Sequence, residues 1–195
     1  FYKKYDQINS VSLDHPGSLF RIDVKRGYES PVAKEELLNK SNEIIAEIFK
    51  TTTGIMKIEG LSEAFRNCVS ENPKKFINNI TPFLNIPRIY QHALLWGLDE
   101  VWRANKDFNW EVVFDFISKL IKADDFWNEE YRGYNYRDWI ISQIAELIEG
   151  GTKDDNHAFS PRLLPMAEKI LLILAKKTDS NLHNVNNLVN SVLNS

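Results

Sequence analysis

The chain has 195 residues, of which 43% are hydrophobic, 12% aromatic and 26% charged. This composition is that of a folded globular protein and excludes a disordered chain, a collagen or a disulfide scaffold. The formal net charge of −3 lacks the basic excess of a typical nucleic-acid-binding protein, and the longest apolar run, at 170–175, is too short to span a bilayer.

The first 29 residues show no helical periodicity. Apolar residues alternate with polar ones at 11–13 and 20–24, on either side of a turn-forming stretch at 15–18. This pattern fits two short strands, but a lone hairpin is marginally stable without a surface to pack on. We therefore predict an extended or irregular lead-in at 1–29 and a helical domain at 30–195.

Helix signals begin at Ser30 and Pro31, which we interpret as an N-cap and a first-turn proline. Acidic residues at 35 and 36 then lie near the positive end of the helix dipole. Ser41 begins a second helix, which ends at the polar stretch 51–54. The predicted buried stripe of this helix is Ile44, Ile45, Ile48 and Phe49.

The rest of the chain consists of amphipathic stretches separated by short polar or proline-marked turns. We predict helices at 61–71, 73–85, 87–105, 109–123, 136–150, 160–177 and from 180 onward. The predicted buried stripes are Tyr90/Leu94/Leu98/Val101, Val113/Phe116/Ile117/Leu120/Ile121, Ile140/Ile144/Leu147/Ile148 and Leu163/Leu164/Ala167/Ile170/Leu171/Leu174. Pro161 after Ser160 predicts a first turn, and Gly150 with Gly151 predicts a left-handed helix stop.

Helix pairs of roughly 40 residues joined by short turns are typical of HEAT and armadillo repeats. We therefore predict an all-α fold in which antiparallel helix pairs stack as a short superhelix, with a closed helical bundle as the alternative. The apolar stripe at 182–193 continues to the last residue without a capping signal. We expect the chain to be an internal fragment of a longer polypeptide.

No pattern in the sequence predicts a catalytic, cofactor-binding or metal-binding residue. The four histidines, His15, His92, His157 and His183, are scattered and lack partners at zinc-site spacing. The loop at 152–157 carries oxygen donors but lacks the ligand order of an EF-hand, so we interpret it as a solvated linker. The sequence has no glycine-rich phosphate loop, GxSxG or HExxH motif.

Cys68 is the only cysteine, which excludes an internal disulfide and favours a reducing compartment, by default the cytoplasm. Its helical spacing from Leu61 and Phe65 predicts a buried small apolar residue rather than a nucleophile. Trp96, Trp102 and Trp110 lie within or beside apolar stripes and are predicted to make core or inter-repeat contacts.

The segment 124–159 holds nine Asp and Glu residues against three Lys and Arg residues, a local charge of −6. We interpret it as a solvated insertion between two helices; the alternative is a docking face for a basic partner. The aromatic and arginine residues between Trp127 and Trp139 are similar to a single-stranded nucleic-acid surface. The surrounding acidic residues oppose phosphate, so we favour packing of these aromatic residues between helices.

Five stretches carry a family resemblance: Ser30–Ser41, Glu71–Phe76, Tyr90–Leu98, Asn109–Val113 and Asp138–Gly150. Their order resembles the helical-repeat regions of large multidomain bacterial proteins, including nucleotide-dependent defence and signalling ATPases. The resemblance covers about residues 30–195 and implies a scaffold or sensor arm. Any nucleotide-hydrolysing domain would lie outside this chain, and no catalytic residue of such proteins maps onto it.

We therefore expect a non-catalytic helical scaffold that recognises a protein partner or other domains of the same chain, without nucleic acid or membrane. One alternative is an α/α-toroid-like enzyme, whose pocket would gather carboxylates such as Glu100, Asp107 or Asp138 with shifted pKa values. The other is a HEAT-like nucleic-acid binder. Residues 61–123 hold 8 Lys and Arg against 7 Asp and Glu, too balanced for that function.

Overall fold

A computed structural model describes residues 29–128, 135–153 and 157–178, and these residues are helical or in loops. The prediction of an all-helical fold is confirmed for this part of the chain. The expected strands at 1–28 and the expected helix from 180 onward lie outside it. The elements are α1 (Lys34–Asn39), α2 (Asn42–Thr51), α3 (Ile55–Glu71), α4 (Pro73–Ile77), the 3₁₀ turn η2 (Thr81–Asn85), α5 (Arg88–Arg103), α6 (Trp110–Lys122), α7 (Asp124–Asn128), α8 (Tyr136–Lys153), the 3₁₀ turn η3 (Pro161–Leu163) and α9 (Leu164–Lys177).

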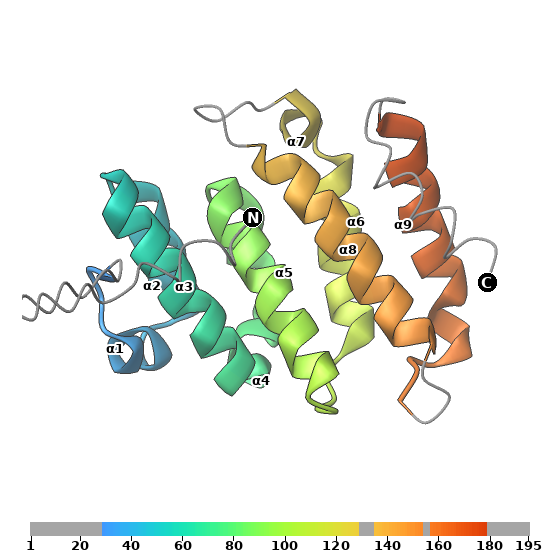
Figure 1. The fold of residues 1–195 in the computed structure, drawn as a ribbon, viewed down its shortest axis with the longest axis horizontal. Helices are drawn as coiled ribbons and strands as arrows, with labels where there is room; N and C mark the ends of the chain where they lie inside the picture. The colour runs from blue at the N-terminus through green and yellow to red at the C-terminus, as the bar shows by residue number, and fades with distance from the viewer. Residues whose placement is uncertain (1–28, 129–134, 154–156, 179–195) are drawn as a thin grey trace, which may run out of the picture.

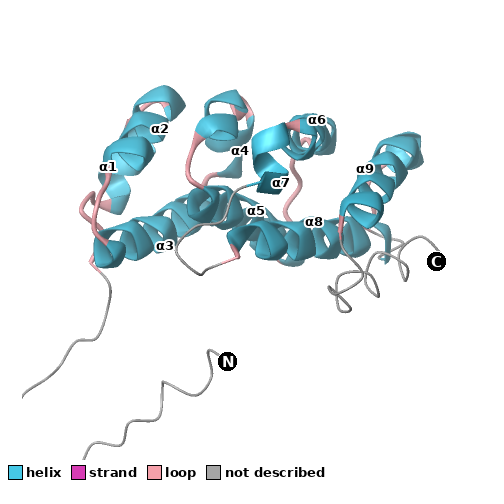
Figure 2. Ribbon diagram, turned by 90° about the horizontal axis from the view of Figure 1, so that it is seen from above, coloured by secondary structure: helices cyan, strands magenta, loops and turns pink. Residues whose placement is uncertain are grey.

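The helices form two layers (Figure 2). One layer holds α3, α5 and α8 side by side, with α3 packed on α5 and α5 packed on α8. The other layer holds α2, α4 and α6, and α9 contacts both α6 and α8 (Figures 1 and 2). From α2 to α6 the α-helices therefore alternate between the layers, and α3, α5 and α8 share one face. None of the helices in the described ranges is long and apolar enough to cross a membrane.

Side-chain caps explain where several helices begin. The Ser41 hydroxyl accepts a hydrogen bond from the backbone N–H of Ile44, as its position in the sequence predicted. Asn72 caps α4 in the same way, with Pro73 at the first helical position. Asn109 accepts from two backbone N–H groups at the start of α6. These caps satisfy N–H groups that the helices themselves leave without partners.

The core contains a cluster of aromatic rings between the layers. Phe49 of α2 stacks on Tyr90 of α5, with ring centroids 4.0 Å apart, and meets Phe65 of α3 edge-on at 4.7 Å. Phe76 and Phe83 complete this cluster from the segment between α3 and α5. All five side chains are fully or almost fully buried. Aromatic burial of this kind dominates the stability of small cores and fixes how the two layers meet.

A second aromatic cluster holds α5, α6 and the segment before α9 together. Trp102 meets Trp110 edge-on with ring centroids 4.9 Å apart, and Trp110 contacts Phe114 and Phe159. Trp102 and Trp110 are therefore core residues, as the sequence predicted. Cys68 is also fully buried as predicted, and burial raises the pKa of its thiol to about 11.

Most predicted helices and stripes are confirmed, with corrections at particular residues. The four stripes of α5, α6, α8 and α9 are buried except for Leu164, which is exposed because it lies at the first residue of α9. Ile44 of α2 is also exposed, whereas its neighbours Ile45 and Phe49 face the core. The helix predicted at 61–71 begins six residues earlier, at Ile55. The one predicted at 73–85 is divided into α4 and η2.

Two predicted helix boundaries are wrong. Ser30 does not cap α1, because its hydroxyl bonds the carbonyl of Val32 and the helix begins only at Lys34. Gly151 does not end α8, which continues to Lys153. A Cβ at Gly151 would lie 2.6 Å from the Phe159 ring and 2.9 Å from Trp110, so this glycine allows close packing rather than a left-handed turn. The interpretation of 124–159 as a solvated insertion is also wrong, because this segment holds α7 and α8, and both helices bury apolar residues in the core.

Candidate functional site

A groove of about 750 Å³ runs across the shared face of α3, α5 and α8. Each helix contributes residues at helical spacing, so that three stripes face the same space. The polar and aromatic side chains that line the groove are Glu59, Ser62, Glu63 and Arg66 from α3, His92, Trp96, Asp99, Glu100 and Arg103 from α5, and Tyr136, Trp139, Ser142, Gln143 and Glu146 from α8.

A glycine allows α3 and α5 to approach closely beneath the groove. A Cβ at Gly97 would lie 2.9 Å from the carbonyl oxygen of Arg66 and 2.9 Å from the side chain of Val69. No larger residue fits between these backbones without moving them apart. The close approach places side chains of α3 directly beside those of α5.

Aromatic rings form a row across the groove. His92 lies between Trp96 and Trp139, with ring centroids 5.5 Å and 5.8 Å away, and Tyr136 meets Trp139 edge-on. Trp96 is 39% exposed and Trp139 is 40% exposed. Large aromatic side chains that remain this exposed in a concave surface are a common feature of binding sites.

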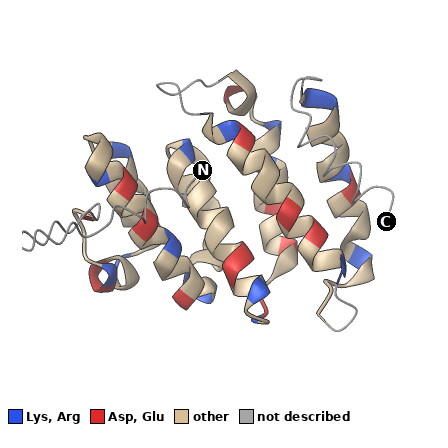
Figure 3. Cartoon of the chain, viewed as in Figure 1, with Lys and Arg blue, Asp and Glu red and all other residues tan. Residues whose placement is uncertain are grey.

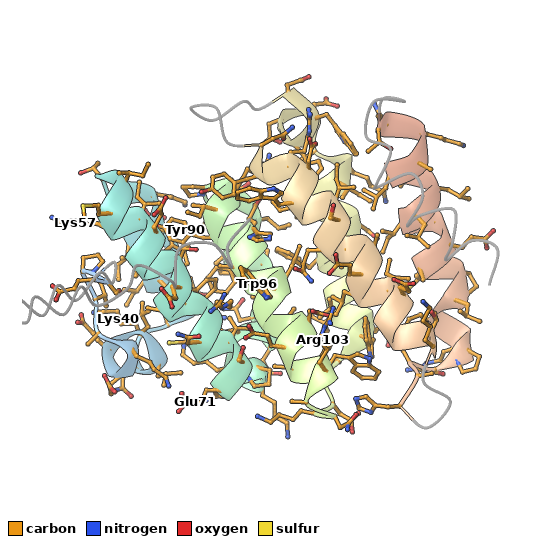
Figure 4. The ribbon with its side chains drawn as sticks, in the orientation of Figure 1. Lys40, Lys57, Glu71, Tyr90, Trp96 and Arg103 are labelled. Carbon is orange, nitrogen blue, oxygen red and sulfur yellow. The ribbon has the colours of Figure 1, made fainter. Side chains whose placement is uncertain are left out.

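Arg66 lies over the Trp96 ring and forms an ion pair with Glu100. Its guanidinium carbon lies 4.2 Å from the centroid of the Trp96 ring, within the range of a cation–π contact. Its Nε lies 3.6 Å from Oε1 of Glu100, and the other oxygen of Glu100 accepts a hydrogen bond from Ser70 at 2.5 Å. These contacts place the guanidinium over the indole in the groove wall, where Nε of Arg66 forms an ion pair but no hydrogen bond among the described residues (Figure 4 labels Trp96 on α5).

Arg103 links α5 to α8 at the other end of the groove. Its Nε donates to Asp99 at 2.7 Å, and its NH2 group lies 3.7 Å from a carboxylate oxygen of Glu146. Burial raises the pKa of the Glu146 carboxyl, and the negative charge of Asp99 adds to this effect. The two carboxylates therefore share one arginine across the helix–helix contact.

Negative charge exceeds positive charge in the groove. The described lining residues include five carboxylates and two guanidinium groups. Both arginines are paired, whereas Glu59 and Glu63 have no ion-pair or hydrogen-bond partner among the residues that the structure describes. Figure 3 shows acidic positions on each of α3, α5 and α8 along this face. The groove is therefore an acidic surface with exposed aromatic rings.

His92 is neutral at physiological pH. Burial, and to a smaller extent the positive charge of Arg66, lowers the pKa of its imidazole to about 4. The ring therefore contributes an uncharged aromatic surface between the two tryptophans and adds no positive charge to the groove.

Gln143 carries the most buried polar side chain of the α8 wall. The residue is only 8% exposed, and its amide nitrogen has no hydrogen-bond partner in the part of the chain that is described. A buried donor without a partner is unfavourable for folding, by about 1–3 kcal/mol.

The carboxylates that the enzyme alternative named do not come together. Glu100 lines the groove, but Asp138 contacts Arg137 and Asn135 at the start of α8, and Asp107 lies 3.7 Å from His157 in a separate loop. The groove instead gathers Glu59, Glu63, Asp99 and Glu146 with Glu100. No cluster of three or more potential metal ligands occurs within the described ranges.

The structure corrects the predicted position of Trp96. Trp96 is a groove residue and not a core residue, since it lies on the face of α5 opposite the stripe that contains Tyr90 and Leu94. Of the predicted aromatic contacts, Trp127 packs on Phe126 and donates to the Ile121 carbonyl. Tyr131, Arg132 and Tyr134 lie outside the described residues.

A second periodic pattern in the sequence indicates which helix faces line the groove. His92 and Trp96 are four residues apart, as are Glu59 and Glu63, and Trp139 and Gln143. Each pair therefore shares one helix face, on the side away from the apolar stripe. The signal for these groove-lining faces is a mixture of aromatic and acidic residues on the outer side of three helices in one layer.

Comparison with models of protein families, with curated proteins and with solved structures finds no match to this chain.

Proposed function

We propose that the chain is a HEAT- or armadillo-like helical scaffold whose α3–α5–α8 groove binds a segment of a protein partner. The observation that carries this proposal is the pair of exposed tryptophans, Trp96 and Trp139, in a groove with ordered polar walls. Aromatic anchors surrounded by polar groups are typical of protein interfaces.

The two-layer arrangement supports a repeat fold. Helices α2, α4 and α6 lie in one layer, and α3, α5 and α8 lie in the other (Figure 2). Along the chain α3 follows α2, α5 follows α4 after the turn η2, and α8 follows α6 after the short helix α7. Repeat proteins use the face of one such layer as an extended binding surface. The partner is a separate protein or another domain of the same polypeptide, as the resemblance to multidomain bacterial proteins implies.

The charge of the groove favours a protein partner over nucleic acid. Five carboxylates line it, and both of its arginines are already paired with them. A surface that binds phosphates needs available Lys and Arg side chains, which this groove does not offer.

One observation favours a second candidate function, a hydrolase of the α/α-toroid type. Burial raises the pKa of the Glu146 carboxyl, which lines the groove beside Arg103, and carboxyls with raised pKa values are typical of general acids. Against it, Asp99, the other acidic partner of Arg103, is 5% exposed and has little access to a substrate. If the chain turns over a substrate and Glu146→Gln abolishes that turnover, the hydrolase replaces the scaffold.

Site-specific photo-crosslinking in the source cells tests the scaffold proposal. A benzophenone side chain at Ser62, in the groove wall, is expected to capture one identifiable protein segment. The matched control places the same group at Lys119, an exposed position on α6 in the other layer. Capture of the same protein from both positions, or capture from neither, contradicts binding in the groove.

A further inference from the structure

We propose that the groove takes an extended basic segment of its protein partner, with one Lys or Arg side chain over Trp139 and another against Glu59 and Glu63. This inference rests on the proposed scaffold function and names the chemistry of the partner.

Charge complementarity is the first argument. Glu63 is exposed and Glu59 is half-buried, and no cation among the described residues pairs with either of them. A cationic side chain from a partner would neutralise charges that the chain itself leaves unmatched. A neutral or acidic segment would leave them unmatched or add to the repulsion.

Helix register brings these carboxylates level with the aromatic row. Helices α3 and α5 run in the same direction, since Lys57 and Tyr90 lie at one end and Glu71 and Arg103 at the other (Figure 4). Arg66 is level with Trp96 and Glu100, which it contacts.

At a rise of 1.5 Å per residue, Glu63 lies about 4.5 Å before Arg66 and His92 about 6 Å before Trp96. Trp139 contacts His92 from the other side. Glu63, His92 and Trp139 therefore lie at about one level across the groove.

The chain itself shows that a guanidinium fits this surface. Arg66 already lies 4.2 Å above the Trp96 ring with a carboxylate beside it. Trp139 offers a comparable indole without a cation of its own among the described residues. A basic side chain from a partner would repeat at Trp139 the arrangement that Arg66 makes at Trp96.

The placement of the two contacts supports an extended backbone in the groove. Glu63 of α3 and Trp139 of α8 line the same groove from the helices on either side of α5. Alternate side chains of an extended segment point to the same side, so two basic side chains of one such segment can reach both contacts.

A titration of the ¹⁵N-labelled chain with synthetic peptides tests the proposal. The probe is a seven-residue peptide of alternating glycine and arginine, and the readout is the indole N–H signal of Trp139, assigned with Trp139→Phe. We expect saturable shifts with a Kd of about 1 mM or tighter, weakening as salt is added. The matched neutral probe has citrulline in place of arginine, and spermine serves as a free cation without a peptide backbone.

Substitutions locate the two contacts. Trp139→Ala is expected to weaken binding of the arginine peptide about tenfold, followed by the indole N–H signal of Trp96, since this variant lacks the Trp139 indole. Glu59→Gln with Glu63→Gln is expected to weaken it by a similar factor. The matched controls are Leu172→Ala and Glu168→Gln, exposed residues of α9 outside the groove, which are expected to leave the Kd within about twofold. Circular dichroism confirms that each variant is folded.

Each outcome decides the proposal. Shifts at Trp139 with the arginine peptide alone support it. Equal binding of the citrulline peptide overturns the role of charge, and equal binding of spermine overturns a protein segment as the occupant. No shift with any probe overturns the proposal, while capture of a partner from Ser62 would still leave the scaffold function standing.

Discussion

The guanidinium of Arg66 lies 4.2 Å above the ring of Trp96, so the chain places one of its own cations on an exposed tryptophan in the groove. Glu100 holds this arginine in position, and Ser70 holds Glu100. The groove is therefore an aromatic and acidic surface. Arg66 covers Trp96, whereas Trp139 has no cation over it among the described residues.

This relationship predicts the effect of removing the internal cation. Arg66→Gln exposes the Trp96 ring and unpairs Glu100, so the groove gains one aromatic face and one unmatched negative charge. The arginine peptide is expected to bind about three- to tenfold tighter, measured by the indole titration. Arg162→Gln, in an exposed ion pair with Glu111, is the matched control. Weaker binding by the Arg66 variant would contradict the account, because it would make this arginine part of the contact surface.

The close approach of α3 and α5 at Gly97 predicts how much stability is lost when these helices are pushed apart. Gly97→Ala places a methyl group 2.9 Å from the Arg66 carbonyl and the Val69 side chain, and is expected to lower the free energy of unfolding by about 1–3 kcal/mol.

Gly150→Ala provides the matched control in α8, since its Cβ would meet only Trp102, at 3.7 Å. Because alanine favours a helix interior over glycine, this control is expected to stabilise by about 0.5–1 kcal/mol. Urea unfolding measures both values. Equal effects at the two glycines would show that the close helix approach is not needed.

His92 predicts a dependence of stability on pH. Burial and Arg66 lower the pKa of its imidazole to about 4 in the folded chain, from 6.5. The unfolded chain therefore binds more protons between pH 6.5 and pH 4, and stability falls as the pH falls through this window.

The contribution of His92 is on the order of 3 kcal/mol over the whole window. His92→Gln removes the titration, so the stability difference between wild type and variant is expected to shift against wild type from pH 7 to pH 4.5. Urea unfolding at each pH measures it, and NMR titration of the imidazole gives its pKa. A folded-state pKa near 6.5 would refute this prediction.

Asn42 of α2 forms hydrogen bonds that link α2 to the end of α4. Its buried amide donates to the carbonyls of Phe76 and Asn79, at 3.2 Å and 2.7 Å, and satisfies groups that the end of α4 leaves open. Asn42→Ala is expected to lower the free energy of unfolding by about 1–3 kcal/mol. The exposed Asn67 of α3 is the matched control, and Asn67→Ala is expected to change stability by less than about 0.5 kcal/mol. A comparable loss in both variants would mean that these hydrogen bonds contribute nothing.

Apolar periodicity predicted the helices and most of the core, because burial of one helix face is a local property of the sequence. Tyr90, Leu94 and Leu98 are buried as their spacing indicates. Gly151 was misread because the need for a small residue comes from Phe159, eight positions further along the chain. Such a contact depends on tertiary packing, and a local turn rule does not include it.

The groove could be predicted only in part from the sequence. Trp96 was predicted to make core or inter-repeat contacts because it lies beside an apolar stripe, although its position on α5 places it opposite the buried residues and in the groove. The spacing of Glu59 and Glu63 shows that they share a face. It does not show that Trp139, 76 residues later in the chain, lies across the same groove, since this depends on how three helices are arranged in one layer.

Binding of a partner in the α3–α5–α8 groove is tested most directly by calorimetry, which measures the affinity of the chain for the partner captured from Ser62. The account predicts that Trp139→Ala weakens the affinity of the purified partner at least about tenfold, while Leu172→Ala, an exposed apolar truncation on α9, changes it less than about twofold. Unchanged affinity in the Trp139 variant, or an equal loss in both variants, would contradict binding in the groove.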